Sequence, residues 1–136
     1  MQALPLLIRL ARRQADARRV ALSEAELAVR EAGQRLATHE ALTAAETARA
    51  SGNASEMAAW VHWSRRSARE TRQLDHAYAV LAAREAEIRA ALTEDFAETK
   101  RLEIALEARR REAAKHAARK TEKLAEDVEL RRPRAG

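Results

Sequence analysis

The sequence has no cysteine and little glycine, proline or aromatic residue. Its 136 residues include three glycines and two prolines, and only 3% are aromatic. Without cysteine, neither a disulfide framework nor a thiolate metal site can form. Three scattered glycines cannot build the loop that cradles phosphates in nucleotide-binding proteins. The sequence therefore predicts a chain with no bound nucleotide or other cofactor.

The apolar content is mostly alanine. Hydrophobic residues make up 46% of the chain, but 34 of them are alanine. An alanine side chain buries little area, so this composition cannot fill a thick globular core. Alanine, glutamate, arginine and leucine dominate, which is typical of a coiled coil or a long helix. We expect an all-α protein.

Helix-breaking residues cluster at one internal place, the polar stretch Ser-Gly-Asn-Ala-Ser at residues 51–55. Pro5 lies near the start, where the first turn of a helix tolerates proline. The simplest interpretation is a single helical hairpin over the whole chain. Its predicted parts are a helix at 4–50, a turn at 51–54 and a helix at 54–132.

The turn residues have the chemistry that helix ends need. Gly52 is expected to take the left-handed conformation that closes the first helix. Asn53 can cap the second helix, and Glu56 follows three residues later in a pattern resembling a capping box.

Apolar residues recur at heptad spacing, which predicts a left-handed antiparallel coiled coil. The first predicted helix has one such series at Ile8, Ala15, Leu22, Val29, Leu36 and Thr43. The second has Leu74, Leu81, Ile88 and Leu102 at one core position, and Tyr78, Leu92, Thr99, Leu106 and Ala113 at the other. Glu85 and Asp95 interrupt the core, and we expect Phe96 to rotate into the gap beside Asp95. Exposed ion pairs four residues apart are expected to add support: Glu26–Arg30, Glu31–Arg35, Glu85–Arg89 and Glu107–Arg111.

The second predicted helix is longer than the first. With the turn near residue 52, Leu4 lies opposite about residue 101, which leaves about 30 residues, or roughly 45 Å of helix, without a partner. Residues 100–136 carry 12 basic and 7 acidic side chains, whereas residues 31–99 carry 8 basic and 11 acidic ones. The hairpin is thus predicted to end in a basic C-terminal overhang.

Nothing in the sequence indicates catalysis. The four histidines are far apart and match no zinc-binding pattern. His39 falls at a core position, where a structural role is expected. A two-helix hairpin has no cavity that could shift the pKa values of paired carboxylates. We therefore predict no catalytic residue, no metal site and no enzymatic activity.

Two groups of residues suggest binding instead. Met57, Trp60, Val61 and Trp63 follow the turn, and they are either packing that locks the hairpin tip or a hot spot for a partner protein. The basic residues of the C-terminal helix are either a solvated face or an electrostatic footprint for an acidic surface. Acidic residues interleave with them and stacking aromatics are absent there, which disfavours nucleic acid.

The chain resembles the FliJ family, the small stalk-like component of the bacterial flagellar export apparatus, and in particular its alanine-rich alphaproteobacterial branch. The resemblance covers nearly the whole chain and includes the hairpin layout. Its most specific part is the Phe-x-x-x-Lys-x-Leu-Glu motif that begins at Phe96. The segments that carry it are residues 4–13, Ala59 with Trp60, residues 95–103 and residues 124–132.

The resemblance implies a non-enzymatic role. Members of the family are similar to the central shaft of rotary ATPases, insert their joined helix ends into a hexameric export ATPase, and contact the export gate and export chaperones. It implies a cytoplasmic protein, a monomer or weak dimer, held at the inner face of the cytoplasmic membrane through its partners. Candidate ATPase-facing residues are Arg9, Arg12, Arg13, Lys100, Leu102, Glu103, Arg109, Arg110 and Arg111. The tip, with Met57, Trp60 and Trp63, is the candidate contact for the gate.

Two other functions stay open at the level of sequence. One is a generic coiled-coil oligomeriser or chaperone-like scaffold, in which helices pair between chains. The other is nucleic-acid binding through the basic C-terminal helix, whose mark would be a steep loss of affinity with salt. A relative from a virulence secretion system would have the same features as a flagellar protein.

Overall fold

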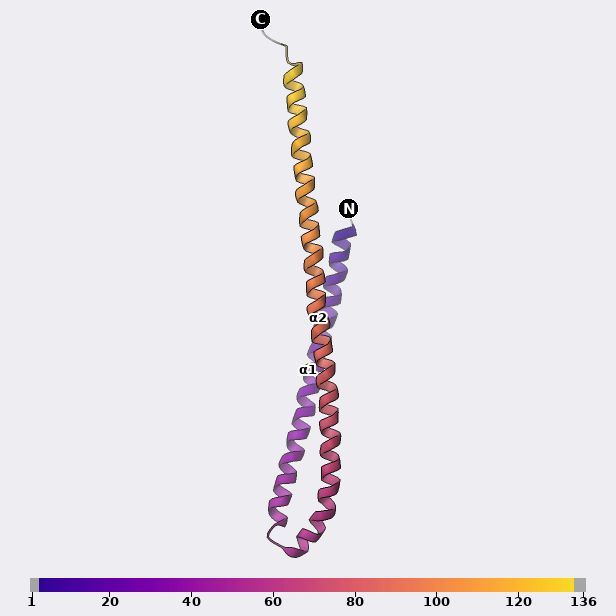
Figure 1. Cartoon of the computed structure of the whole chain (residues 1–136), viewed down its shortest axis with the longest axis vertical. Helices are drawn as coiled ribbons and strands as arrows, with labels where there is room; N and C mark the ends of the chain where they lie inside the picture. Colours follow the sequence, from indigo (N-terminus) through magenta and orange to yellow (C-terminus); the bar gives the residue numbers. More distant parts are fainter. Residues whose placement is uncertain (1–2, 134–136) are drawn as a thin grey trace. The chain divides into compact units, whose positions relative to one another are not determined.

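The computed structural model describes residues 3–133 and contains two α-helices. Helix α1 spans Ala3–Ala50 and helix α2 spans Ala54–Arg131 (Figure 1). No strand occurs in these residues. The all-α prediction is confirmed, and the helix ends lie within one residue of the expected positions. The ends of the predicted hairpin, residues 1–2 and 134–136, lie outside the described part.

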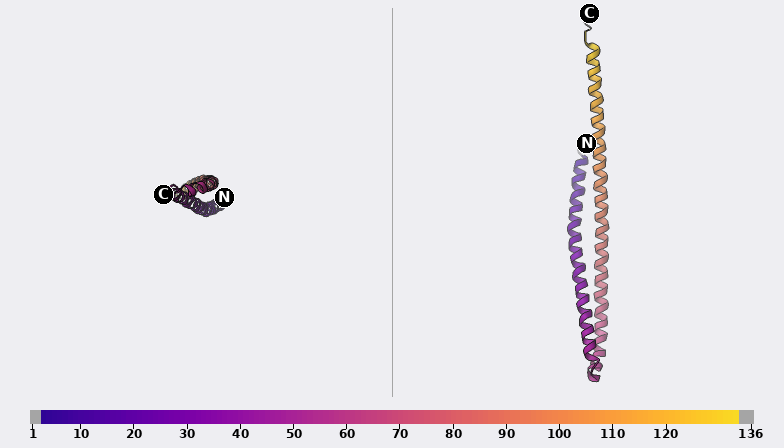
Figure 2. Two further views of the ribbon diagram at one scale, coloured as in Figure 1. Left: turned by 90° about the horizontal axis from the view of Figure 1, so that it is seen from below. Right: turned by 90° about the vertical axis from the view of Figure 1, so that its left-hand side faces the viewer.

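The helices divide into two compact units. The terminal unit comprises Met1–Gln14 and Asp95–Gly136, and the turn unit comprises Ala15–Glu94. Each unit contains one segment of α1 packed beside one segment of α2 (Figures 1 and 2).

In the turn unit the two helices run antiparallel. Thr47 contacts Trp60 and Thr43 contacts Ser67, so the partner's number rises as the α1 number falls. Further from the turn, Glu26 contacts Arg89. This order fixes the hairpin topology that the sequence predicts.

The less exposed residues of the turn unit follow the heptad spacing on both helices. Most of them are only partly covered, because two helices alone cannot enclose a side chain; the buried apolar ones include Ala15, Ala32, Ala50 and Leu92. Small residues at these positions allow the helices to approach closely. Gly33 lies against Tyr78, and a Cβ placed on this glycine would be 3.4 Å from the Tyr78 ring.

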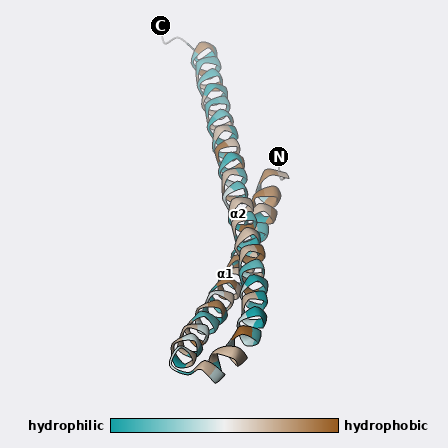
Figure 3. Ribbon diagram, turned by 60° about the horizontal axis from the view of Figure 1, so that its bottom comes forward, coloured by the Kyte–Doolittle hydropathy of each residue, from teal (hydrophilic) through white to brown (hydrophobic). Residues whose placement is uncertain are grey.

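In the terminal unit the covered positions end at Leu106. Leu4 and Ile8 of α1 are buried, and Leu102 and Leu106 of α2 are partly covered. Every residue from 107 to 131 is exposed, which includes Ala113, the last residue of the predicted heptad series. These residues are called the overhang below. In Figure 3 its ribbon is coloured mainly as hydrophilic, with isolated apolar positions.

The turn closes α1 differently from the prediction. No glycine among residues 3–133 has a positive φ, so the left-handed conformation expected at Gly52 is wrong. Instead, the Ser51 amide donates to the Thr47 carbonyl at 3.2 Å and the Ser51 hydroxyl donates to the Ala48 carbonyl at 2.8 Å. These bonds satisfy carbonyls that the end of a helix leaves free.

The cap of α2 is close to the prediction. The Asn53 side-chain oxygen accepts the amide of Ser55 at 2.9 Å and, more weakly, that of Glu56 at 3.5 Å. The Asn53 amide donates back to the Ala50 carbonyl at 3.3 Å. Asn53 is thus the N-cap residue, and its own amide is satisfied by the turn.

Two side-chain expectations are corrected. Phe96 stays 43% exposed, so it does not become the buried core residue that the sequence suggested. Glu26 pairs with Arg89 across the helices at 3.1 Å, where a pair with Arg30 was expected. The predicted pairs Glu85–Arg89 and Glu107–Arg111 form, at 2.6 and 3.2 Å.

Candidate functional site

A groove in the terminal unit brings together several of the predicted binding residues. It lies between the first turns of α1 and the last covered turns of α2. Three arginines and two glutamates surround an apolar floor that includes Ile8 and Leu106. The charged residues that line it are Arg9, Arg12, Glu103, Glu107 and Arg110.

One ion pair crosses this groove. The Arg12 guanidinium donates a 2.9 Å hydrogen bond to the Glu103 carboxylate. Their side chains are 61% and 37% exposed, so water screens the pair and its contribution to stability is small. The bridge fixes which residues of α1 and α2 face a molecule approaching the groove.

The other predicted residues of this unit do not line the groove. Arg13, Lys100 and Arg109 are exposed on the surface of the helices. Arg111 is held by Glu107 on its own helix, with the two side-chain atoms 3.2 Å apart. Leu102 is partly covered at a core position, so it packs the two helices together and offers little surface to a partner.

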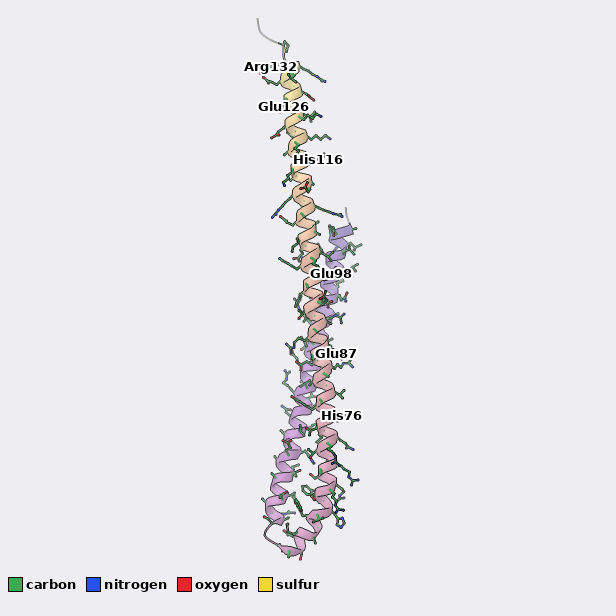
Figure 4. All side chains as sticks on the ribbon, viewed as in Figure 1. His76, Glu87, Glu98, His116, Glu126 and Arg132 are labelled. Atoms are coloured by element: carbon green, nitrogen blue, oxygen red, sulfur yellow. The ribbon has the colours of Figure 1, made fainter. Side chains whose placement is uncertain are left out.

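The overhang presents side chains on all its sides. His116 and Glu126 both project from it into solvent (Figure 4). Its charges are divided along the helix. Residues 107–123 carry seven basic and three acidic side chains, and residues 124–130 carry three acidic ones and no basic one. The exposed apolar residues among them include Leu124 and Val128, at 58% and 69%.

The tip of the turn unit holds both tryptophans of the chain. Trp60 and Trp63 are partly covered, and the Trp60 indole N–H donates to the Thr47 hydroxyl at 3.1 Å. Met57 and Val61 are 40% and 43% exposed. The two interpretations of this cluster, packing and partner binding, therefore apply to different residues. The indoles pack partly against the hairpin, while Met57 and Val61 are available to another surface.

A buried polar cluster lies between the helices where the sequence indicated only a core histidine. The His39 Nε2 atom is 3.1 Å from the Ser67 carbonyl oxygen and 3.2 Å from its hydroxyl. The Thr43 and Ser67 hydroxyls are 2.8 Å apart, and Ser67 is only 4% exposed. On the outer side, the His39 Nδ1 atom is 3.7 Å from a Glu70 carboxylate oxygen. The signal that could have revealed this cluster is the heptad register, which places His39, Thr43 and Ser67 all at core positions.

Within residues 3–133, no group of three or more acidic or histidine side chains is arranged to hold a metal ion. The hydrogen bond to Glu85, with the charges of Glu85 and Glu26, raises the pKa of Arg89. An arginine already charged at neutral pH gains no new chemistry from such a shift. Neither helix in the described part is long and apolar enough to cross a membrane.

No family model, no curated protein and no solved structure matches this chain. The resemblance to the FliJ family therefore stays a prediction from the segments that suggested it.

Proposed function

We propose that this chain is a non-enzymatic stalk-type adaptor of a bacterial flagellar type III export apparatus. Its terminal unit docks onto the export ATPase ring, and its tip faces the export gate or export chaperones. The protein acts by binding alone and uses no cofactor. It is cytoplasmic, and its partners hold it at the inner face of the membrane.

The observation that carries the proposal is the overhang. It is 25 residues of helix, all exposed, and it continues from a groove lined by Arg9, Arg12 and Arg110. A single helix in water is stabilised only weakly by its own hydrogen bonds and ion pairs, so a long exposed one is suited to insertion into a partner. Its basic first part favours an acidic collar.

The experiment is to measure the affinity of the full chain for the cognate export ATPase at low salt, beside two charge variants. Arg109→Gln, Arg110→Gln and Arg111→Gln together remove three charges from the overhang. Arg65→Gln, Arg69→Gln and Arg72→Gln remove three from the turn unit and serve as the matched control. We expect the first variant to bind roughly tenfold more weakly and the second to bind like the parent. Equal affinities for all three proteins would refute docking through the overhang.

A second candidate function is a homo-oligomeric scaffold, and the divided charge of the overhang favours it. Arg109, Arg110 and Arg111 lie near the start of the overhang, and Glu126, Asp127 and Glu129 lie near its end. Two overhangs that pair antiparallel, centred near residue 118, place these opposite charges side by side. Exposed Leu124 and Val128 would then become partly buried.

Light scattering separates the two candidates. The scaffold predicts a dimer at micromolar concentration that dissociates as salt is raised. The stalk predicts a monomer or weak dimer under the same conditions.

A further inference from the structure

The side of α1 that faces away from α2 is apolar over the N-terminal half of the helix. Residues packed toward α2 recur at two heptad positions, and the buried ones include Leu4, Ile8, Ala15 and Ala32. The two positions farthest from them are two and five residues after Ile8 and its repeats, and in a two-helix hairpin they face water. Such positions are usually polar, so a continuous row of apolar residues there marks an interaction surface.

This row is called the outer stripe below. All its members are exposed, and the leucines and the valine have between 49% and 61% of their surface in contact with water. Because α1 runs unbroken from Ala3 to Ala50, the stripe follows one face of a single helix. The same two heptad positions are polar further along, at Glu31, Gln34 and Thr38, so the stripe ends before them. The outer stripe consists of Leu6, Leu10, Arg13, Ala17, Val20, Glu24 and Leu27.

The outer stripe is complementary to itself when it is reversed. In an antiparallel pair of helices, each residue at one heptad position faces a residue at the other position of the opposite helix. With two copies of α1 centred between residues 18 and 19, Leu10 of one copy meets Leu27 of the other. Ala17 meets Val20 at the centre, where the small alanine lets the helices approach closely. Two-fold symmetry repeats each contact.

The two charged members of the stripe, Arg13 and Glu24, also meet in this arrangement. They are eleven positions apart in the sequence, or about 16 Å along the helix, so they cannot pair within one chain. Neither forms an ion pair with another residue of the described part, whereas the nearby Asp16 is bonded to Arg19 at 2.9 Å. A parallel pair of helices would place Arg13 beside Arg13 and Glu24 beside Glu24. The charges therefore select the antiparallel arrangement.

We propose that the outer stripe binds the outer stripe of a second copy of this chain, as an antiparallel two-fold dimer. Leucine layers form its two ends, the alanine and valine layers form its centre, and an ion pair lies between centre and end on each side. Helix α2 packs on the opposite face of α1, so it does not obstruct the stripe. The inference goes beyond both functions proposed above, because it uses no residue of the overhang or of the tip.

The two rims of the stripe differ in charge. One rim brings Arg9 of one copy near Arg30 of the other. Both side chains are exposed, so water and salt screen their repulsion, which lowers the affinity without preventing the contact. The other rim is uncharged and extends the apolar contact. It holds Leu7, Gln14, Ala21 and Ala28.

The contact is small, so the dimer is expected to be weak. From residue 10 to residue 27 it is about 26 Å long, and a helix is about 10 Å wide. Its footprint of roughly 260 Å² is about a third of the area that a stable interface usually covers on each partner. We expect a dissociation constant of roughly 100 µM. The protein is then a monomer at micromolar concentration, where a scaffold paired through its overhangs would be a dimer.

The test is a charge exchange between copies, measured by sedimentation equilibrium at concentrations that span this dissociation constant. Arg13→Glu gives a chain with two acidic stripe residues, and Glu24→Arg gives a chain with two basic ones. Each chain alone should dimerise at least tenfold more weakly than the parent, because like charges meet. An equimolar mixture should regain the parent's affinity to within about threefold, since each arginine again meets a glutamate. A mixture that associates no more tightly than its components would overturn the proposal.

Cysteine cross-linking tests the orientation, because the chain has no cysteine of its own. A chain with Leu10→Cys and a chain with Leu27→Cys should form a disulfide with each other when they are mixed. Neither should cross-link with itself, because identical positions lie about 26 Å apart in the antiparallel dimer and a disulfide needs Cα atoms within about 7 Å. Efficient self-linking of the Leu10→Cys chain would show a parallel pair and contradict the arrangement.

Matched serine variants locate the contact on α1. Leu10→Ser with Leu27→Ser should abolish the dimer. Leu42→Ser is the control, because Leu42 is 60% exposed on the same helix but lies outside the stripe, and this variant should dimerise like the parent. All the substituted residues are exposed, so circular dichroism should show the parent's helicity in each variant.

The overhang variant with Arg109, Arg110 and Arg111 replaced by glutamine separates this contact from the other proposals. It should bind the export ATPase more weakly and keep the α1 dimer. If it loses the dimer while the serine double variant keeps it, the contact lies in the overhang and the inference is overturned. No ATPase enters the dimer measurements, so failure of the dimer and failure of the stalk function are distinguishable.

Discussion

Arg12 and Glu103, 91 positions apart in the sequence, are joined by a 2.9 Å hydrogen-bonded ion pair in the terminal unit. The pair lies about one turn before the last covered residue of α2, Leu106. Beyond that point α2 continues as the exposed overhang. The bridge therefore marks where the paired part of the terminal unit ends.

The contribution of this bridge to the free energy of unfolding is predicted to be small. In a double-mutant cycle with Arg12→Ala and Glu103→Ala, the coupling energy from urea unfolding should be about 0.2–1 kcal/mol, because both side chains are well exposed. A coupling of several kcal/mol is typical of ion pairs removed from water. Such a value would contradict the exposed geometry.

Truncation of a covered leucine is predicted to lower the free energy of unfolding much more than truncation of an exposed one. Leu92 is 8% exposed and Leu124 is 58% exposed. Leu92→Ala should lower the free energy of unfolding by about 2–3 kcal/mol, at the low end of the usual range because a two-helix core is thin. Leu124→Ala is the matched control and should change it by no more than about 0.5 kcal/mol. Similar losses for the two variants would contradict the assigned core.

Gly52 gives a test of the turn itself. Its φ is not positive, and a Cβ built there meets no atom within 4 Å. Gly52→Ala should therefore stabilise the hairpin by about 0.4–1 kcal/mol, because alanine restricts the unfolded chain. If Gly52 were left-handed, the same substitution would destabilise the hairpin. Thermal unfolding of this one variant therefore decides between the two conformations.

The His39 cluster is predicted to specify how the helices pair. Polar groups at core positions fix register and orientation at some cost in stability. Replacing His39 and Ser67 together by leucine should raise the melting temperature and produce dimers or larger species in light scattering. If this variant stays monomeric with the parent's helix register, measured by cross-linking near the turn, the cluster has no such role.

The sequence predicted the fold well because the decisive signal is long and regular. Heptad spacing repeated from Ile8 to Thr43 fixes the buried face of α1, and one cluster of turn residues leaves a single place to reverse the chain. Comparing the helix lengths placed the end of pairing near residue 101, a little over one helical turn before Leu106, where the covered positions end. The heptad spacing and the helix lengths depend on many residues, so one wrongly assigned residue does not change the predicted fold.

Local details were less predictable. The conformation of Gly52 depends on which carbonyls the turn satisfies, and Ser51 satisfied them without a left-handed residue. The partner of Glu26 depends on side-chain position across the helices, which spacing along one helix does not report. The groove beside Arg12 likewise needed the three-dimensional register. Its charged residues were named from the sequence in part, but Ile8, Leu106 and Glu107 were not assigned to a site.

The central claim is that this chain acts on an export ATPase through its terminal unit. The most direct test is the ATPase activity of the cognate flagellar export ATPase, titrated with the full chain and with a version that ends at Leu106. The account predicts stimulation by the full chain and little or none by the shortened one, which removes only exposed residues from the described part of the chain. Equal stimulation by both, or none by either, would contradict it.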